Sequence, residues 1–395
     1  MGSGVLDGLR VLDFGRYIAG PYCAALLGDL GAEVVRVERR EGSEDRFLVP
    51  VTPDGSGGIF MQCNRGKLGL TLDPVTPEGR EVTRRLVRTA DVVVANLPPR
   101  ALESMGLDYA SLVAEKPGII LTMVTAFGSS GPYADRVGFD GIGQAMSGAM
   151  YLSGTPDAPV KCSVNYVDFT TAISAALGTV AALLERQKTG RGQIVDASLF
   201  GTALTLMNAA LIEQAVLGVG RVGTGNRSQN SGPSDTFRTT DGWVLVQVVG
   251  QPLFERWVRL MGEPPWLEDP RYSTDAARGQ NGAALSDRTQ AWCGARTTEE
   301  ALAALEAARI PAGPVNAPAQ TLEDPHLQQG SFFESSHYPG QARPIPVARA
   351  PFGLGGGGAA VHGRAPTLGE HTDRILRSLG YSAADIAGLR ERGAV

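Results

Sequence analysis

The chain has 395 residues, of which 43% are hydrophobic, which is enough to bury a large core and form two or three domains. Its formal net charge of −5 and pI near 5.6 give no basic field, so nucleic acid is excluded as an expected partner. The four cysteines form no CxxC pair, which argues against a zinc site or a disulfide scaffold and fits a reducing cytosol.

The amino terminus and the apolar stretches carry no membrane signal. Residues 1–7 lack the basic and apolar regions of a signal peptide. Gly2 is compatible with myristoylation, but no second membrane-binding signal accompanies it. Charged residues interrupt the longest apolar stretches before about 18 residues, the length that a spanning helix needs. We therefore expect a cytoplasmic protein that neither spans nor binds a membrane.

Short β-branched runs alternate with helical patterns over residues 9–128. The expected strands are 9–14, 34–38, 91–96 and 119–124, a further strand follows Lys67, and helices are expected over 19–30, 78–89 and 109–116. Strands separated by helices in this way predict a parallel sheet with both faces covered. In such sheets, ligands bind beyond the carboxyl ends of the strands.

The middle of the chain predicts a second, smaller domain of roughly one hundred residues. A long helix from Phe169 to Thr189, a strand over 193–198 and an apolar helix over about 201–217 lead into a Gly-, Asn- and Ser-rich stretch over 218–233. A strand over 243–248 and helices near 252–261, 285–293 and 298–308 follow. Near the end of the chain, Ser382 is expected to cap a short helix.

Two common kinds of site are disfavoured. Residues 218–223 match GxGxxG, but they follow a predicted helix and open a loop, whereas a dinucleotide fingerprint follows a strand and opens a helix. All four histidines lie at position 326 or later. Chemistry in the first 325 residues must therefore run without imidazole, which disfavours a Ser-His-Asp triad and most histidine-ligated metal sites. No metal site is expected.

Asp168 is the main candidate for chemistry. It directly precedes a long apolar helical segment, where free backbone N–H groups and the helix dipole keep a carboxylate ionised. Asp168 can therefore be a helix N-cap or a nucleophile. Asp140 offers a second carboxylate, which either pairs with Asp168 for acid–base work or caps a helix over 141–149.

Basic residues gather where predicted strands and turns end. Arg39 and Arg40 follow one strand, Arg65 and Lys67 precede another, Arg100 follows Asn96-Leu97-Pro98-Pro99, and Arg136 lies before Phe139-Asp140. A phosphate-bearing ligand could collect these side chains, with arginine as a bidentate fork and lysine as a point charge. The alternative is solvated surface charge at each position.

Eight short motifs, taken in chain order, resemble one known family. They are Leu12-Asp13-Phe14, Ala19-Gly20-Pro21, Val37-Glu38-Arg39, Asn64-Arg65-Gly66-Lys67, residues 91–96, Gly190-Arg191-Gly192-Gln193, Gly313-Pro314-Val315 and Leu368-Gly369-Glu370-His371-Thr372. Over residues 8–392 the chain is similar to the class III CoA-transferases, a superfamily that includes formyl-CoA transferase, the carnitine CoA-transferases and α-methylacyl-CoA racemase.

The resemblance implies an α/β fold in an interlocked homodimer. It implies a doubly wound parallel-sheet large domain built from both chain ends, with a smaller α+β domain between them. The expected boundaries are 1–200 for the first part of the large domain, 201–232 for a linker, 233–325 for the small domain, and 326–395 for a return linker and the rest of the large domain.

The resemblance also implies the residues of the site. By position, Asp168 matches the catalytic aspartate, and Ile18, Phe139 and Asp140 are expected to support it. The expected acyl-CoA-binding residues are Tyr17, Ala19, Arg39, Arg65, Lys67, Asn96, Leu97, Arg100 and Arg136. Coenzyme A and acyl-CoA are substrates together with a small carboxylic acid, for which succinate is an example, and no tightly bound cofactor is expected.

Three positions depart from relatives within the superfamily. Racemases carry a Gly-His-Asp motif where this chain has Gly138-Phe139-Asp140, and phenylalanine cannot move a proton. Residues 230–233 stand where formyl-CoA transferase has a mobile run of glycines, which argues against oxalate and formate as substrates. An arginine of that enzyme is missing near Ser104, and Arg100 is the candidate to replace it.

The expected reaction is CoA transfer from an acyl-CoA to a free carboxylic acid through an aspartyl mixed anhydride and an aspartyl-CoA thioester. An aspartate with a reference pKa of about 3.9 is already ionised at neutral pH, so no general base is needed. The alternatives are an acyl-CoA racemase or epimerase of the same superfamily and a non-catalytic CoA-binding subunit.

Overall fold

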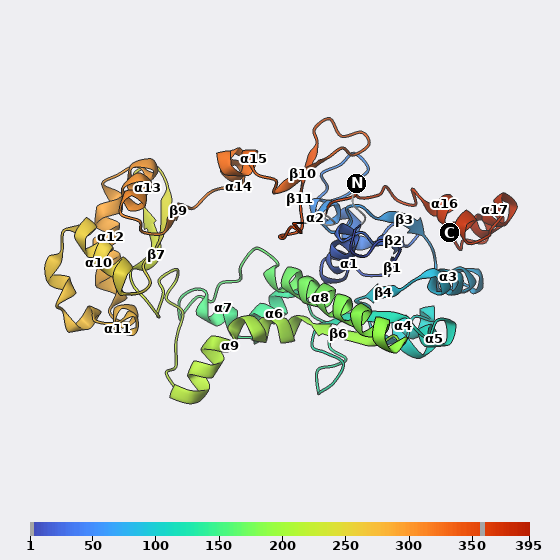
Figure 1. The fold of residues 1–395 in the computed structure, drawn as a ribbon, viewed down its shortest axis with the longest axis horizontal. Helices are drawn as coiled ribbons and strands as arrows, with labels where there is room; N and C mark the ends of the chain where they lie inside the picture. Colours follow the sequence, from blue (N-terminus) through green and yellow to red (C-terminus); the bar gives the residue numbers. More distant parts are fainter. Residues whose placement is uncertain (1–3, 356–359) are drawn as a thin grey trace. The chain divides into compact units, whose positions relative to one another are not determined.

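The chain divides into two compact units in the computed structural model, which describes residues 4–355 and 360–395 (Figure 1). Unit 1 comprises Met1–Ser147, Ser163–Ala209 and Gly330–Val395, so both ends of the chain contribute to it. Unit 2 comprises Gly148–Cys162 and Ala210–Gln329.

Six parallel strands form the centre of unit 1. They are β1 (Arg10–Asp13), β2 (Glu33–Glu38), β3 (Leu68–Thr71), β4 (Val92–Ala95), β5 (Ile120–Thr125) and β6 (Ile194–Ser198). Their order in the sheet is β3-β2-β1-β4-β5-β6, so the chain builds outward on one side of β1 and then continues on the other side from β4. This is the order of a doubly wound sheet, and the predicted α/β fold with a parallel sheet is confirmed.

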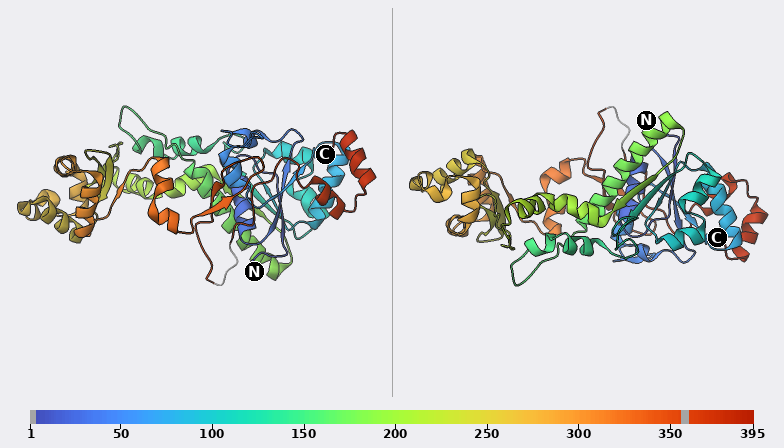
Figure 2. Two further views of the ribbon diagram at one scale, coloured as in Figure 1. Left: turned by 90° about the horizontal axis from the view of Figure 1, so that it is seen from above. Right: turned by 90° about the horizontal axis from the view of Figure 1, so that it is seen from below.

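Helices cover both faces of this sheet (Figure 2). The helices of unit 1 are α1 (Ala19–Asp29), η1 (Glu44–Phe47), α2 (Gly58–Cys63), α3 (Pro77–Thr89), α4 (Pro99–Met105), α5 (Tyr109–Glu115), α6 (Asp140–Met146), α8 (Tyr166–Thr189), the first part of α9 (Leu199–Leu217), α16 (Thr372–Ser378) and α17 (Ala383–Glu391). Side chains alternate across a strand, so Val92 and Val94 pack with α1 and α8 on one face, while Val93 packs with α3, α4, α5, α16 and α17 on the other.

The C-terminal segment is part of the unit 1 core. Ile375 and Leu376 of α16 and Leu389 of α17 are buried in the same cluster as Leu86 of α3. Ser382 caps α17 through a reciprocal pair of hydrogen bonds with Asp385, as predicted for Ser382. The antiparallel pair β10 (Phe333–Ser336) and β11 (Ile345–Ala348) precedes these helices.

Unit 2 is built on an antiparallel sheet in the order β7-β8-β9. The strands are β7 (Ser234–Arg238), β8 (Trp243–Gln247) and β9 (Ala312–Pro314), and the helices are α7 (Ala149–Leu152), the end of α9, α10 (Gln251–Met261), η2 (Pro264–Leu267), η3 (Pro270–Tyr272), α11 (Asp275–Gln280), α12 (Gly282–Gly294), α13 (Thr298–Ala307), α14 (Pro318–Glu323) and α15 (Pro325–Gln329). Its core packs Phe237 and Val244 of the sheet against Trp257, Leu285 and Leu305 of the helices.

The helix expected over about 201–217 is confirmed, because α9 ends at Leu217, and the boundary between the units falls within this helix. Two local expectations are wrong. The helix expected over 141–149 is two helices, because Gly148 takes a left-handed conformation with φ 92° that interrupts it. Helix α4 follows directly after β4 and was not expected, although Pro99 at its first position is a typical helix start.

Two helices, α8 and α9, are long and apolar enough to cross a membrane by length and composition, contrary to the expectation from the charge pattern. Half of the apolar window of α8 is buried inside the protein, because this helix packs against α1, β5 and β6 as a core helix does. The window of α9 is only 11% buried.

Candidate active site

A cavity of about 600 Å³ opens at the carboxyl edge of the unit 1 sheet. Its walls are the turn after β1, the segments after β4 and β5, residues 134–139 and the first turn of α8. Parallel strands bring their carboxyl ends to one edge, and the strand order reverses between β1 and β4. The cavity therefore lies at the switch point of the sheet, where ligands of doubly wound folds bind.

Asp168 lies in the first turn of α8 and lines this cavity. The N-cap position belongs to Asn165, so the interpretation of Asp168 as the N-cap is wrong. No residue within 4–355 or 360–395 donates a hydrogen bond to the Asp168 carboxylate. The carboxylate is buried but faces the cavity, so its oxygens are available to a ligand.

The carboxyl group of Asp168 has a strongly perturbed pKa. Burial, and secondly the negative charge of Asp140, raise this pKa from 3.8 to about 7. The helix dipole at the start of α8 acts in the opposite direction, because it favours the ionised form. A carboxyl group with a pKa of about 7 is only partly ionised at neutral pH, which differs from the expectation of almost full ionisation.

Asp140 supports Asp168 directly. It is the first residue of α6, and its Oδ2 accepts the backbone N–H of Asp168 at 3.0 Å. Its Oδ1 accepts a short hydrogen bond from Gln144. Asp140 therefore does not cap its own helix but satisfies a free N–H group at the start of α8. The negative charge of Asp140 acts on the Asp168 carboxyl group, and the acid–base role of this pair stays a prediction.

The turn between β1 and α1 forms another wall of the cavity. Tyr17 has φ 61°, an unusual conformation for a residue with a side chain. The Asn96 amide fixes this turn, because its Oδ1 accepts the Arg16 N–H at 2.6 Å and its Nδ2 donates to the Arg16 carbonyl at 2.8 Å. Tyr17 then meets Phe139 edge to face, with ring centroids 5.3 Å apart.

The structure brings most of the expected site residues together. Besides Asp168, the residues that line the cavity include Tyr17, Ile18, Ala19, Asn96, Leu97, Arg100, Arg136 and Phe139. Arg136 stacks on the ring of Tyr133 at 4.0 Å. Arg100 precedes Ser104 by four residues on α4, so the two share a helix face, and Arg100 reaches the cavity from there.

Lys67 does not reach this cavity, although the resemblance implies that it contacts CoA. Its ammonium is buried, lies 2.7 Å from Asp13 Oδ2, and donates to Pro21 O at 2.7 Å and Asn64 Oδ1 at 3.0 Å. These three acceptors use all three N–H groups of an ammonium. Lys67 is thus a structural residue that neutralises a buried carboxylate.

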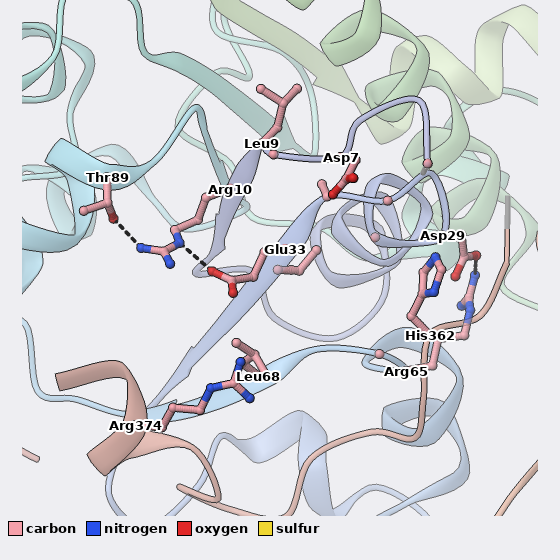
Figure 3. A pocket seen from close by; sticks show the side chains of 17 residues that line it. Asp7, Leu9, Arg10, Asp29, Glu33, Arg65, Leu68, Thr89, His362 and Arg374 are labelled. Carbon is pink, nitrogen blue, oxygen red and sulfur yellow. Dashed lines mark hydrogen bonds and ion pairs between the residues drawn. The ribbon is translucent and has the colours of Figure 1, made fainter. Parts of the chain in front are cut away.

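Arg65 is likewise buried, paired with Asp29 and stacked over Tyr22. It lines a different cavity of about 790 Å³ at the amino-terminal edge of the sheet, where His362 lies beside the Arg65–Asp29 pair (Figure 3). Arg39 follows β2 at the correct edge, but it is 64% exposed, pairs with Glu44 at 3.0 Å and lies outside the Asp168 cavity. Arg65, Lys67 and Arg39 are therefore not brought to Asp168.

The lining residues that sequence reasoning missed include Arg16 and Leu199. Arg16 follows β1 directly, so its position at a strand end was a usable signal. Leu199 begins α9 directly after β6 and reaches the cavity through the crossover topology alone. Within 4–355 and 360–395, no group of three or more His, Cys, Asp or Glu side chains could hold a metal ion.

The fold and the site define an α/β protein with a buried carboxylate and cationic side chains lining one cavity at a sheet switch point. The model of CoA-transferase family III matches residues 6–372. The chain is 35% identical to succinyl-CoA–D-citramalate CoA-transferase of Chloroflexus aurantiacus, over 98% of this chain and 97% of that protein. It is 34% identical to succinate–glutarate CoA-transferase of Agrobacterium fabrum, over 95% of each.

Solved structures with the same fold support this family assignment. A CAIB/BAIF family protein from Brucella suis superposes with a TM-score of 0.84 at 34% identity, covering 96% of this chain and all of that one. A hypothetical protein from Mycobacterium tuberculosis superposes with a TM-score of 0.82 at 29% identity, covering 95% of this chain. The chain belongs to CoA-transferase family III and is a class III CoA-transferase, as the sequence motifs indicate.

Proposed function

We propose that this enzyme transfers CoA between carboxylic acids with Asp168 as the covalent nucleophile. The observation that carries the proposal is a buried carboxylate that no described side chain or backbone group bonds, facing a cavity lined by Arg16, Arg100 and Arg136. A carboxylate held for structure would be hydrogen-bonded. A carboxylate left without a donor, in a cavity that arginines also line, is suited to attack an acyl group that arrives with an anionic carrier.

The reaction balances without a further reactant. An Asp168 oxygen attacks the thioester carbon, the C–S bond breaks, and CoA thiolate leaves a mixed anhydride. The thiolate attacks the Asp168 carbonyl carbon, which releases the donor acid and forms an aspartyl-CoA thioester. The acceptor carboxylate then attacks this thioester and expels CoA thiolate. The thiolate attacks the acceptor carbonyl of the new anhydride, which frees Asp168 and the product acyl-CoA.

The turn of Tyr17, Ile18 and Ala19 supplies candidate donors for the oxyanion. The first N–H groups of α1 have no acceptor within the helix, and this turn lines the cavity with Asp168. Backbone donors fixed in advance stabilise developing charge at low reorganisation cost. The clamp from Asn96 fixes this turn, so we assign Asn96 to positioning the donors, and Arg100 and Arg136 to the phosphates of CoA.

We further propose that the acyl groups exchanged come from dicarboxylic acids larger than oxalate, such as succinate and glutarate. The relatives from C. aurantiacus and A. fabrum are named for succinyl-CoA with citramalate and for succinate with glutarate. A formyl-CoA:oxalate CoA-transferase of Rhodopseudomonas palustris is 33% identical, so relatives with small substrates stand at a similar distance. A screen of acceptor acids against succinyl-CoA separates the two groups.

We propose that the protein works in the cytoplasm as an interlocked homodimer, as the family resemblance implies. Apolar side chains that include Leu177 of α8 and Leu206, Ile212, Val216 and Leu217 of α9 are exposed in the single chain. Soluble monomers rarely expose so many large apolar side chains along two helices. Light scattering of the purified protein should give the mass of two chains, and a monomer mass would contradict the proposal.

Proton exchange at the α-carbon, the racemase chemistry, is a second candidate. The pKa of Asp168 near 7 favours it, because such a group can both take and give a proton. Phe139 offers no second proton carrier, and the carboxylate of Asp140 is occupied by Asp168 N–H and Gln144. Uptake of deuterium from solvent into recovered acyl-CoA would favour this reaction over transfer.

Mass spectrometry of the intact protein after incubation with acyl-CoA tests the transferase proposal. We expect a mass increase on the peptide that contains Asp168, converted to a hydroxamate by hydroxylamine. The control is Asp135→Asn, which changes an exposed carboxylate at the cavity rim and should leave the Asp168 adduct in place. No adduct across a broad panel of acyl-CoAs, succinyl-CoA included, would refute covalent catalysis by Asp168.

The pH dependence gives a separate prediction for Asp140. Since the nucleophile is the ionised form and its pKa is raised to about 7, kcat/KM of the wild type should rise with pH through about 7. Asp140→Asn removes the negative charge but keeps an oxygen that can accept the Asp168 N–H. The rise should therefore move to lower pH by up to about one unit. Profiles between pH 5 and 9 that coincide would show that Asp140 does not set the ionisation of Asp168.

A further inference from the structure

Four cationic and three anionic side chains gather beneath the carboxyl ends of β1 and β2. Three of the cations have a carboxylate partner: Arg36 with Asp45 at 2.9 Å and Asp13 at 3.5 Å, Lys67 with Asp13 at 2.7 Å, and Arg46 with Glu38 at 2.6 Å. All six of these side chains are buried. The fourth cation is Arg16.

Arg16 has a different environment from the other three. Its Nη1 donates to the carbonyl oxygens of Gly15 at 2.8 Å, Phe14 at 3.2 Å and Val37 at 3.4 Å. Across residues 4–355 and 360–395, no carboxylate lies within 4 Å of its guanidinium, and Nε and Nη2 have no hydrogen-bond acceptor. These two nitrogens are not enclosed either, because Arg16 is only partly buried and lines the Asp168 cavity.

The charges of the cluster do not balance. Arg16, Arg36, Arg46 and Lys67 face Asp13, Asp45 and Glu38, which leaves one positive charge in excess. Burial, and secondly the charge of Arg36, lower the pKa of Arg16 to about 10, so the guanidinium still carries its charge at neutral pH. Even a partly buried charge is costly unless it is paired, and the cavity is the side from which a partner of Arg16 can arrive.

We propose that Arg16 is the anion anchor of the active site and binds a carboxylate or phosphate group of the substrate through Nε and Nη2. Those two nitrogens form one edge of the guanidinium fork, which fits two oxygens of such a group. The anchor is preformed, because three carbonyls hold Nη1 and Asn96 holds the Arg16 peptide. This inference rests on the proposed function in one respect: the proposed function makes the ligand an acyl-CoA or its acid.

The test compares Arg16→Met and Arg16→Lys with the wild type by isothermal titration calorimetry and steady-state kinetics. The ligands are CoA, pantetheine, which lacks all the phosphates, and succinate and butyrate as acceptors. We expect Arg16→Met to weaken the interaction with the anchored group about 10- to 100-fold, and Arg16→Lys to recover part of it. Arg349→Met, which removes an exposed arginine paired with Glu334, is the matched control.

The two sources of the anion give different patterns. If Arg16 holds a phosphate, Arg16→Met weakens CoA binding and leaves pantetheine binding unchanged. If it holds the far carboxylate of a dicarboxylic acid, the KM for succinate rises while that for butyrate and the affinity for CoA do not. Either pattern supports the anchor.

Equal binding and kinetics in a folded Arg16→Met variant would overturn the anchor, even if its thermal unfolding temperature fell, because Arg16 would then serve only the buried cluster. Failure of the proposed function looks different, since the wild type itself would then transfer no CoA.

Discussion

Asp168→Asn should reduce the rate of CoA transfer by about ten-thousand-fold or more, which is the usual size of the effect when an enzyme loses its catalytic nucleophile. Asparagine has nearly the same shape, keeps the backbone N–H that bonds Asp140 and keeps the first turn of α8. It cannot form an anhydride. The measurement is the initial rate of CoA transfer from succinyl-CoA to a panel of acids, together with the mass of the protein after incubation.

The same substitution should stabilise the folded protein at neutral and alkaline pH. Because burial and Asp140 raise the folded-state pKa of Asp168 to about 7, the folded state holds a proton that the unfolded state releases near pH 4. Stability therefore falls as pH rises between these values, by up to about 4 kcal/mol for a shift of about three units.

Asp168→Asn removes this cost, so denaturant unfolding should show a gain at pH 8 that shrinks towards pH 5. A variant less stable than the wild type at pH 8 would show that the ionised carboxylate is well accommodated. A variant that is more stable than the wild type but inactive is the expected result when a catalytic group destabilises the folded protein.

The fold was predictable because its signals are local. Buried β-branched runs such as Val92-Val93-Val94 identify strands on their own, and helical stretches between them require a parallel sheet. Asp168, Asn96 and the turn of Tyr17 were found for the same reason, since each lies at or near the carboxyl end of a strand or the start of a helix. The order of the motifs identified the family.

The protonation of Asp168 was not predictable from the sequence. Its pKa depends on burial and on Asp140, which lies 28 positions earlier and reaches it only once α6 and α8 pack. Whether an arginine or lysine binds a ligand or pairs with a buried carboxylate also depends on partners that are distant in the sequence. Lys67 meets Asp13 from 54 positions away, and Arg65 meets Asp29 from 36 positions away. A strand-end position indicates where a cation lies, but not what neutralises it.

Lys67→Met should destabilise the protein by about 3–5 kcal/mol, the usual cost of removing one partner from a buried charge pair. Burial alone would raise the pKa of Asp13, but Lys67 and then Arg36 lower it, so the carboxylate is ionised and needs its cations. Without the ammonium, Asp13 keeps the Gly15 N–H at 2.8 Å but has Arg36 as its cation only at 3.5 Å, and Pro21 O and Asn64 Oδ1 lose their donor. Urea unfolding at pH 7 measures the loss.

Arg39→Met is the matched control for Lys67→Met, because both residues were expected to bind CoA and only Lys67 is buried. Arg39 pairs with Glu44 in solvent, and an exposed pair contributes at most about 1 kcal/mol. If Lys67 instead bound CoA, Lys67→Met would keep its stability and lose affinity for CoA. Stability lost at Lys67 and kept at Arg39 would place Lys67 in the buried cluster beneath β1, where it holds Asp13 and, through Arg36, the turn that carries Arg16 to the cavity.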